Sequence, residues 1–260
     1  MMDYFFVDIP VFVPSYDEKK LYGWSRYKDD LWDLLKDTTG GYCMYCYDTV
    51  WINGQRRGQI EHGIEKINSP EYLTDCVPNL GLACENCNGK YKKRGEKRRK
   101  LPEEQIREFK LASCSKYACR IPCERYIKLR SEYVGRGNII LQPFESKFHE
   151  NGNVLKLKYD LLEGKYVPGD CGCSCGYSRK EIEIIEGHIR LFQLNSPERR
   201  NREVGRYCKN VIDHHNLMED MPYHNLVVNL FRNKLQGLSV DNAVKVCKVI
   251  YSRALLQRIT

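Results

Sequence analysis

The feature that most constrains this 260-residue chain is a pair of cysteine knuckles, Cys43-x-x-Cys46 and Cys84-x-x-Cys87. Two such knuckles can place four thiolates around one tetrahedral zinc ion, and a closed shell of four cysteines is typical of structural zinc sites. The 37 residues between the knuckles are more than a plain zinc ribbon needs. The spacing therefore predicts a zinc ion that clamps a larger inserted unit, and the chemistry is expected in that insert.

The composition indicates a cytoplasmic protein. Mean hydropathy is -0.57, and the first residues include Asp3, Asp8 and two prolines without a basic leader, so we expect neither a secretory signal nor a membrane span. A reducing compartment does not preserve structural disulfides, and thirteen cysteines cannot all pair. The high cysteine content thus favours metal binding and buried thiols.

The cysteines outside the knuckles allow two interpretations. Either they join a second zinc site between the halves of the chain, or they are isolated thiols in crowded loops. The candidates form two clusters: Cys114, Cys119 and Cys123, and Cys171, Cys173 and Cys175. Three further cysteines are expected to be small buried residues: Cys76, Cys208 and Cys247. The pair His214-His215 is expected at the surface or at a helix cap.

The local patterns predict an α+β chain with mainly helical C-terminal sequence. Helices are expected at 27–37, 101–113, 180–193, 197–212 and 223–256, the last broken near Gly237. Asn53-Gly54 favours a tight turn between two short strands within 48–66, and residues 138–160 resemble strands. Residues 1–22 are expected to form an irregular arm or an edge strand. We therefore expect an N-terminal arm (1–27), a zinc-clamped domain (28–113) and a mainly helical domain with a small strand patch (114–260).

Positive charge is concentrated directly after the last knuckle. Residues 90–100 contain eight basic residues against Glu96, and so carry seven of the eight net positive charges of the chain. Such a local tract predicts contact with a polyanion, with a solvated helix face as the alternative. The expected phosphate contacts are Lys90, Lys92, Lys93, Arg94, Lys97 and Arg98. Such contacts position a nucleic acid without reading its sequence.

The insert contains polar residues in a recognisable order. Glu61-His62 ends the second expected strand, Asn79 precedes Leu80, and Asn88 follows the last cysteine. The pattern CMYC, IEH, NL and CENCN followed by lysines, over about residues 40–93, resembles the HNH endonuclease family. The resemblance implies a ββα-metal fold. It also implies that His62 is the general base, that Glu61 and Asn88 bind the catalytic cation, and that Asn79 holds the loop that orients the histidine.

The chemistry of these residue types agrees with the implied roles. Hydrolysis of a phosphodiester needs a base for the attacking water and a cation for the charge that develops on phosphate oxygens. A neutral imidazole, with a usual pKa near ~6.5, can accept that proton at physiological pH. Oxygen ligands from Glu61 and Asn88 favour Mg²⁺ or Mn²⁺. The resemblance implies DNA as the substrate.

Sequence beyond the core is similar to a narrower group, the HNH subunits of Septu and Septu-like retron anti-phage systems. The shared features include GGYCMYC, NLGLACENCN, FHENGNVLKLKYD and HIRLFQLNSPERRNREVGRY, within residues 28–212. This resemblance implies a role in defence, and a partner ATPase of the ABC/SMC type that docks on the helical domain. Two other functions stay open: a non-catalytic zinc module that binds nucleic acid or a partner protein, and an effector that cleaves RNA.

Overall fold

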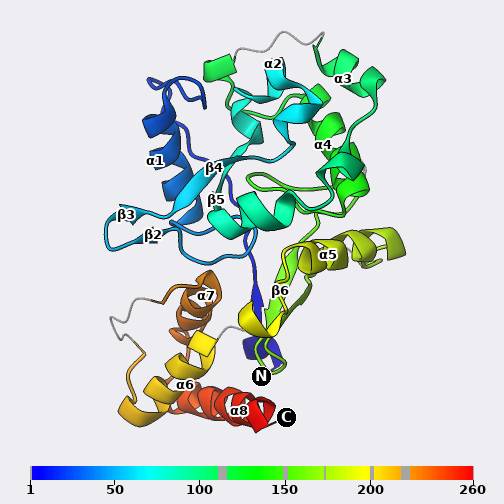
Figure 1. Cartoon of the computed structure of the whole chain (residues 1–260). Helices are drawn as coiled ribbons and strands as arrows, with labels where there is room; N and C mark the ends of the chain where they lie inside the picture. Colours follow the sequence, from blue (N-terminus) through cyan, green and yellow to red (C-terminus); the bar gives the residue numbers. More distant parts are fainter. Residues whose placement is uncertain are drawn as a thin grey trace.

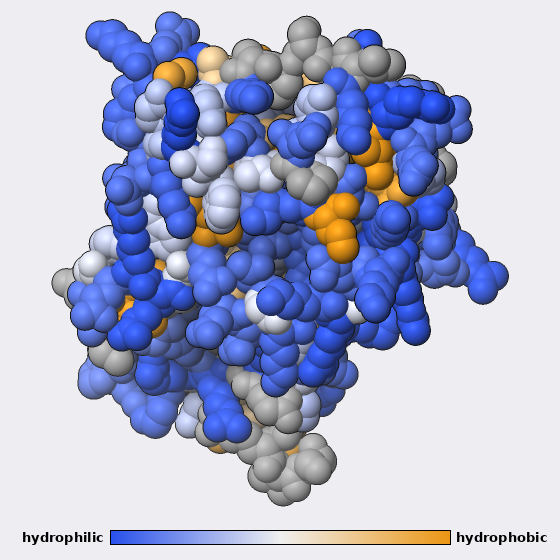
Figure 2. Space-filling model, turned by 45° about the horizontal axis from the view of Figure 1, so that its top comes forward, coloured by the Kyte–Doolittle hydropathy of each residue, from blue (hydrophilic) through white to orange (hydrophobic). Residues whose placement is uncertain are grey.

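The structure, a computed structural model, is a mixed α+β fold in which helices surround three small sheets (Figure 1). It describes residues 2–110, 116–148, 152–172, 174–199, 202–217 and 223–259. In the described residues, no helix is both long and apolar enough to cross a membrane. The face in Figure 2 is mostly hydrophilic, and its apolar residues form small separate spots.

The N-terminal half contains short elements joined by ordered turns. In chain order these are β1 (Phe6–Asp8), α1 (Lys28–Thr39), β2 (Trp51–Ile52), β3 (Gln55–Arg56), β4 (Gly58–His62), α2 (Pro70–Leu73), β5 (Leu80–Cys84), α3 (Glu103–Lys110) and α4 (Glu124–Gly137). A π-helical segment, Asn86–Lys92, follows β5. Strands β2 and β3 form the expected hairpin, because Asn53 and Gly54 both take the positive φ that a type I′ turn requires.

The expected first helix is α1, and local chemistry explains its limits. Asp29 and Asp30 lie in its first turn, where the helix dipole favours negative charge. Leu31, Leu34 and Leu35 are buried on its inner face. Gly40 ends the helix in the left-handed conformation and turns the chain towards Cys43. The helix therefore delivers the first knuckle to the core.

The C-terminal half is mainly helical. It contains β6 (Leu157–Asp160), β7 (Lys165–Pro168), α5 (Arg179–Leu191), α6 (Arg202–His214), α7 (Leu226–Leu235) and α8 (Val240–Ile259). The expected break near Gly237 separates α7 from α8. The predicted helix at 197–212 is shifted: Pro197–Arg199 is a short 3₁₀ turn, and α6 begins at Arg202.

The strand prediction for residues 138–160 was correct only at its end. The Arg130 guanidinium donates to the carbonyl oxygens of Leu141 at 2.6 Å and Pro143 at 2.7 Å. This buried side chain therefore provides the hydrogen bonds that a neighbouring strand would otherwise provide. Among the described residues of this stretch, only Leu157–Asp160 forms a strand, and it pairs with β7, which the sequence patterns did not reveal.

Contacts cross both expected domain boundaries. The first residues include an edge strand, since β1 pairs antiparallel with β6. Helix α4, which follows the boundary at 113, packs against α3, which precedes it. The buried apolar residues form one cluster from Val7 to Ile250. The zinc-clamped and helical parts thus share a core, and the three predicted domains stay a prediction.

Candidate functional site

The two cysteine knuckles meet in space. The four Sγ atoms of Cys43, Cys46, Cys84 and Cys87 all lie within 4.8 Å of one another. Cys46 Sγ and Cys84 Sγ are 3.7 Å apart. A tetrahedral zinc ion with Zn–S bonds of about 2.3 Å requires sulfur separations of about 3.8 Å. The cluster therefore fits the metal that the spacing predicts.

The cluster joins three elements and contacts the helical half. The first knuckle follows α1, Cys84 ends β5, and Cys87 lies in the π-helical segment. From the C-terminal half, the Arg199 guanidinium approaches Cys87 Sγ at 3.6 Å and 3.7 Å and lies over the Tyr91 ring. A guanidinium in this position would offset part of the negative charge of thiolates, so the helical half contributes a side chain to the surroundings of the cysteine cluster.

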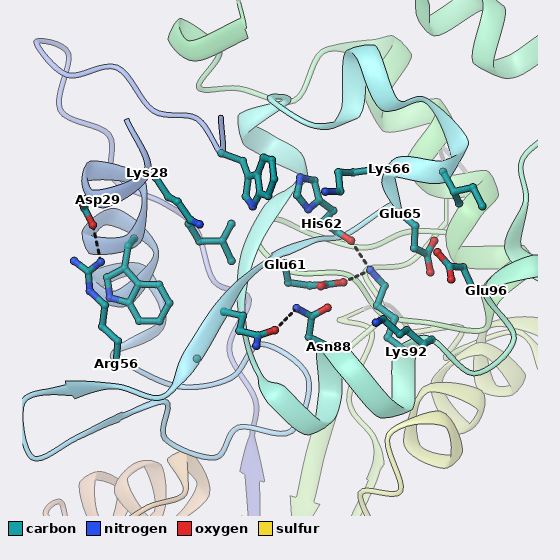
Figure 3. Close-up of a pocket in the computed structure, with 17 residues that line it drawn as sticks. Lys28, Asp29, Arg56, Glu61, His62, Glu65, Lys66, Asn88, Lys92 and Glu96 are labelled. Atoms are coloured by element: carbon teal, nitrogen blue, oxygen red, sulfur yellow. Dashed lines mark hydrogen bonds and ion pairs between the residues drawn. The ribbon is translucent and has the colours of Figure 1, made fainter. Parts of the chain in front are cut away.

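The insert forms two antiparallel strands and a helical segment. Strands β4 and β5 pair so that Glu61 faces Gly81 and His62 faces Leu80 across the ladder. Gly81 leaves room for the Met44 side chain, because a Cβ atom there would lie 2.2 Å from the Met44 sulfur and would force that side chain to move. Asn86–Lys92 then packs against β5. Figure 3 shows Asn88 and Lys92 on this segment, turned towards the strand that carries Glu61 and His62.

The side chain of His62 is buried, and two contacts hold its ring in one orientation. Its Nε2 lies 3.1 Å from the carbonyl oxygen of Thr74, and its ring is in edge contact with Trp24. Because a carbonyl can only accept, Nε2 carries the proton and Nδ1 is the basic nitrogen. Burial, assisted by the charges of Lys66 and Lys92, lowers the pKa of His62 to about 4. The imidazole is therefore neutral at physiological pH.

Asn79 connects the end of β4 with the loop that follows it. Its Oδ1 accepts from Ile64 N–H at 2.7 Å and from the Tyr126 hydroxyl at 2.9 Å. Its Nδ2 donates to the carbonyl oxygens of Ile64 at 3.0 Å and Leu73 at 3.4 Å. Leu73 immediately precedes Thr74, the partner of His62. These contacts are those expected of a residue that holds the loop beside the histidine.

Glu61 is paired with Lys92. The Lys92 ammonium contacts Glu61 Oε1 and also donates to the carbonyl oxygen of His62. Only 2% of the Lys92 side chain and 7% of the Glu61 side chain are exposed. Burial raises the pKa of Glu61, and the charge of Lys92 opposes that rise. Lys92 thus differs from the expected solvent-facing phosphate contact, because its ammonium neutralises a buried carboxylate.

Asn88 lies at the edge of the same site. Its Nδ2 donates to Gln59 Oε1 at 2.9 Å, and Gln59 lies two residues before Glu61 on β4. The bond fixes the segment Asn86–Lys92 against that strand. Gln59 had no recognisable motif in the sequence, since its role depends on strand β4 facing the helical segment.

A pocket of about 840 Å³ contains Glu61, His62 and Asn88, together with Lys92. The buried Asn79 does not line it and acts from behind the loop. Among the other predicted phosphate contacts, Lys93 lines the pocket. The remaining four are exposed away from its lining: Lys90, Arg94, Lys97 and Arg98. The basic tract therefore reaches the pocket through its first part.

Several pocket residues were missed because they come from other parts of the chain. The missed cations are Lys28, Arg56 and Lys66, and the missed aromatic side chains are Trp24 and Trp32. Lys66, four residues after His62, is the one that proximity in sequence could have suggested.

Arg99, another residue of the basic tract, is buried and binds Glu65 at 2.7 Å instead of facing solvent.

The other cysteine and histidine predictions have separate outcomes. Cys76, Cys208 and Cys247 are buried, as expected, and His214 and His215 are exposed. Cys114 and Cys173, from the proposed second zinc site, lie outside the described residues. Among the cysteines, histidines and acidic residues that the structure describes, the four knuckle cysteines are the only group of three or more whose ligand atoms lie close enough to hold one metal ion.

Comparison with known proteins identifies no relative: no protein family, curated protein or solved structure matches this chain.

Proposed function

We propose that this protein is a metal-dependent endonuclease that hydrolyses phosphodiester bonds of DNA. The observation that carries the proposal is the convergence of Glu61, His62 and Asn88 in one pocket, on a strand–strand–helix unit held by four cysteines. The order of these residues resembles that of HNH endonucleases. Because the comparisons identify no family, the proposal depends on this geometry and on the chemistry of the residues.

In the proposed reaction, His62 is the general base. Its Nε2 proton is held by Thr74, so Nδ1 is available to accept a proton from a water molecule. The lowered pKa, about 4, keeps this nitrogen unprotonated over the physiological range. Asn79 positions the histidine through the loop that contains Thr74. Trp24 is in edge contact with the imidazole and would help to hold its orientation.

Glu61 and Asn88 would hold the catalytic Mg²⁺ or Mn²⁺. A carboxylate and an amide in one pocket are hard oxygen donors, the type that these cations prefer. When bound, the cation would stabilise charge on the phosphate oxygens. The bond from Asn88 Nδ2 to Gln59 orients the amide. Lys92, already on Glu61, would reduce the net negative charge that the cation meets.

The substrate assignment is supported by the lysines of the pocket. Its lining also contains acidic residues, and Arg56 is paired with one of them, Asp29, at 2.7 Å. Lys28, Lys66 and Lys93 are the cations that phosphate would contact. Phosphate contacts from such side chains supply binding that weakens as salt concentration rises. An assay that offers DNA and RNA to the protein under the same conditions would show which of the two it cleaves.

The decisive experiment is His62→Ala in zinc-loaded, folded protein with plasmid DNA and Mg²⁺ or Mn²⁺. Loss of a general base should slow cleavage about 10²-fold or more. His214→Ala, which changes an exposed histidine in α6, is the matched control and should cleave at the wild-type rate. Cleavage by His62→Ala at the wild-type rate would contradict the proposal.

One observation favours a second candidate, a non-catalytic zinc module. Lys92 neutralises Glu61 and Gln59 binds the Asn88 amide, so two predicted cation ligands already have protein partners. Such a module would bind nucleic acid in a salt-sensitive manner without any cleavage that depends on divalent cations. Measuring both cleavage and binding of the same plasmid separates the two functions: the module should bind without cleaving.

A role in anti-phage defence with an ATPase partner is part of the proposal, and it depends on the narrower resemblance. The docking surface would lie on the helical half, where α8 exposes Val249, Leu255 and Leu256. Co-expression with the neighbouring genes tests this. A stable complex with an ATPase of the ABC/SMC type is expected, and purification of this chain alone from its native operon would contradict it.

A further inference from the structure

Trp24 lies in the candidate site although the residues around it show no motif. It is half-buried, lines the same pocket as His62, and makes an edge contact with that imidazole, with ring centroids 5.7 Å apart. It belongs to an irregular stretch between β1 and α1. Trp51, by contrast, is half-buried on β2 outside the pocket lining.

The stretch around Trp24 is anchored on both sides. The N–H of Tyr22 donates to the carbonyl oxygen of Tyr117 at 3.0 Å. Gly23 packs so closely on the Tyr117 ring that a Cβ atom would lie 2.3 Å from it. On the other side, the N–H of Ser25 donates to Asp75 Oδ1 at 2.8 Å. These contacts fix the backbone on both sides of Trp24. Asp75, the partner of Ser25, directly follows Thr74, the partner of His62.

Two ammonium groups lie over the indole ring. Lys66 Nζ is 4.1 Å and Lys28 Nζ is 5.5 Å from the ring centroid. Lys66 is half-buried and Lys28 is exposed. An aromatic face with cations beside it has the composition of sites that bind single-stranded nucleic acid, in which bases stack and cations contact the adjacent phosphates.

We propose that Trp24 stacks against an unpaired nucleobase beside the scissile phosphate, and that Lys28 and Lys66 bind the phosphates that flank it. Stacking on an aromatic ring is stronger than an exposed cation–π contact, so the exposed Lys28 would leave the ring for a phosphate when a base arrives. The inference rests on the proposed function, because it requires nucleic acid in the His62 pocket.

The substrate class follows from this arrangement. Both faces of a base inside a continuous duplex are covered by its neighbours, so such a base cannot stack on Trp24 without leaving the helix. Single-stranded segments and duplexes with an unpaired base meet no such cost. Trp24 would thus give the protein a preference for single-stranded or locally unpaired nucleic acid over continuous duplex.

The test uses the full-length, zinc-loaded His62→Ala protein, so that bound substrate is not cleaved. The probes are a single-stranded oligonucleotide containing 2-aminopurine, which loses fluorescence when it stacks, and the same sequence as a duplex. Trp24→Leu should weaken single-strand binding about tenfold, as expected for the loss of one stacked base, and abolish the quenching. Duplex binding should change less than about twofold.

Two further variants separate stacking from a structural role. Trp24→Phe keeps an aromatic face and should retain most of the quenching. Trp51→Leu removes a half-buried tryptophan outside the pocket and should behave as its parent. Thermal unfolding and zinc content confirm that each variant is folded.

The outcomes distinguish this inference from the proposed function. If wild-type protein cleaves DNA but Trp24→Leu binds the single strand with unchanged affinity and quenching, the stacking role is wrong and the nuclease assignment stands. Binding and quenching that depend on Trp24, without any cleavage by the wild type, would support the stacking role and contradict the nuclease. Absence of nucleic-acid binding would overturn both.

Discussion

The zinc-clamped core and the C-terminal helices are stabilised in different ways. The core buries charged and polar side chains, among them Glu61, His62, Asn79, Lys92 and Arg99. Of the described residues beyond position 200, the only buried polar one is Asn225, and α6, α7 and α8 otherwise bury apolar side chains. Burial of polar groups is costly unless each finds a partner, whereas apolar burial stabilises directly.

The contrast teaches where chemistry can occur. Apolar packing in α6, α7 and α8 leaves few buried groups that can hold a proton or a cation, and no described residue of these helices lines the pocket. A zinc ion on the four-cysteine cluster would add the stability that a small polar unit lacks, and so would let the core position such groups. If the contrast is correct, loss of zinc or of a buried polar pair should affect the core more than α6, α7 and α8, which depend on apolar burial.

Removal of zinc should have the largest effect. A zinc chelator, or Cys84→Ser, should unfold the strand–helix unit, since binding of a structural zinc ion supplies on the order of 10 kcal/mol. Hydrogen exchange measures the effect: amides of β5 and Asn86–Lys92 should lose protection, while those of α7 and α8 keep most of theirs. Cys76→Ala, a buried cysteine outside the cluster, is the control. Equal loss of protection in both regions would show that the contrast is wrong.

Breaking the buried ion pair should have the next largest effect. Lys92→Met leaves Glu61 buried without its cation and should lower the free energy of unfolding by about 3–5 kcal/mol. Denaturant unfolding measures it. The matched control is Lys93→Met, which removes the same charge from an exposed neighbour and should change stability by less than about 0.5 kcal/mol. In the double variant with Glu61→Gln, part of the loss should be recovered, and no recovery would contradict a pairwise cause.

The link between the two regions should have a smaller effect. Asn225 caps α7 by accepting from Val227 N–H at 3.0 Å, and its Nδ2 donates to Asp48 Oδ1 at 2.8 Å. Asn225→Ala should destabilise the protein by about 1–2 kcal/mol through loss of the cap. Asn225→Asp keeps a capping oxygen but places a second carboxylate beside Asp48, and should therefore also destabilise the protein. If its stability equals that of the wild type, the contact with Asp48 does not contribute.

Acidification should have the smallest effect near neutral pH. Burial lowers the pKa of His188 to about 3, and its Nδ1 accepts from Ile140 N–H at 3.0 Å. The unfolded chain, with a histidine pKa near ~6.5, binds the proton more readily, so stability falls as pH drops from about 6.5 towards 3. Thermal unfolding across that range measures the fall. His188→Gln retains an acceptor but does not titrate, and should show a shallower pH dependence.

Much of the site was predictable because its signals are local in the sequence. The knuckle spacing predicted a four-cysteine cluster, and the cluster forms. The predicted helix at 27–37 and hairpin at Asn53-Gly54 are present, because caps and turn residues act within a few positions. The pattern also indicated that Glu61, His62 and Asn88 belong to one unit, and the structure brings them to one pocket.

Other features could not be read from local patterns. The strand prediction for 138–160 was correct only at Leu157–Asp160; near its start, Arg130 from α4 binds the carbonyl oxygens of Leu141 and Pro143. Lys92 and Lys93 are adjacent and chemically identical, yet one is buried on Glu61 and the other is exposed in the pocket wall. Which lysine turns inward depends on how Asn86–Lys92 lies against β4.

By itself, the sequence determined the four-cysteine cluster, the α+β class and the order of the candidate residues, since residue type and short-range spacing are properties of neighbouring positions. Only the tertiary structure decided that Trp24 lies beside His62, that Lys92 neutralises Glu61, and that Arg199 reaches Cys87. Each of these contacts joins segments at least 30 positions apart. Such pairings depend on the packing of the whole chain, because no local preference of either segment specifies them.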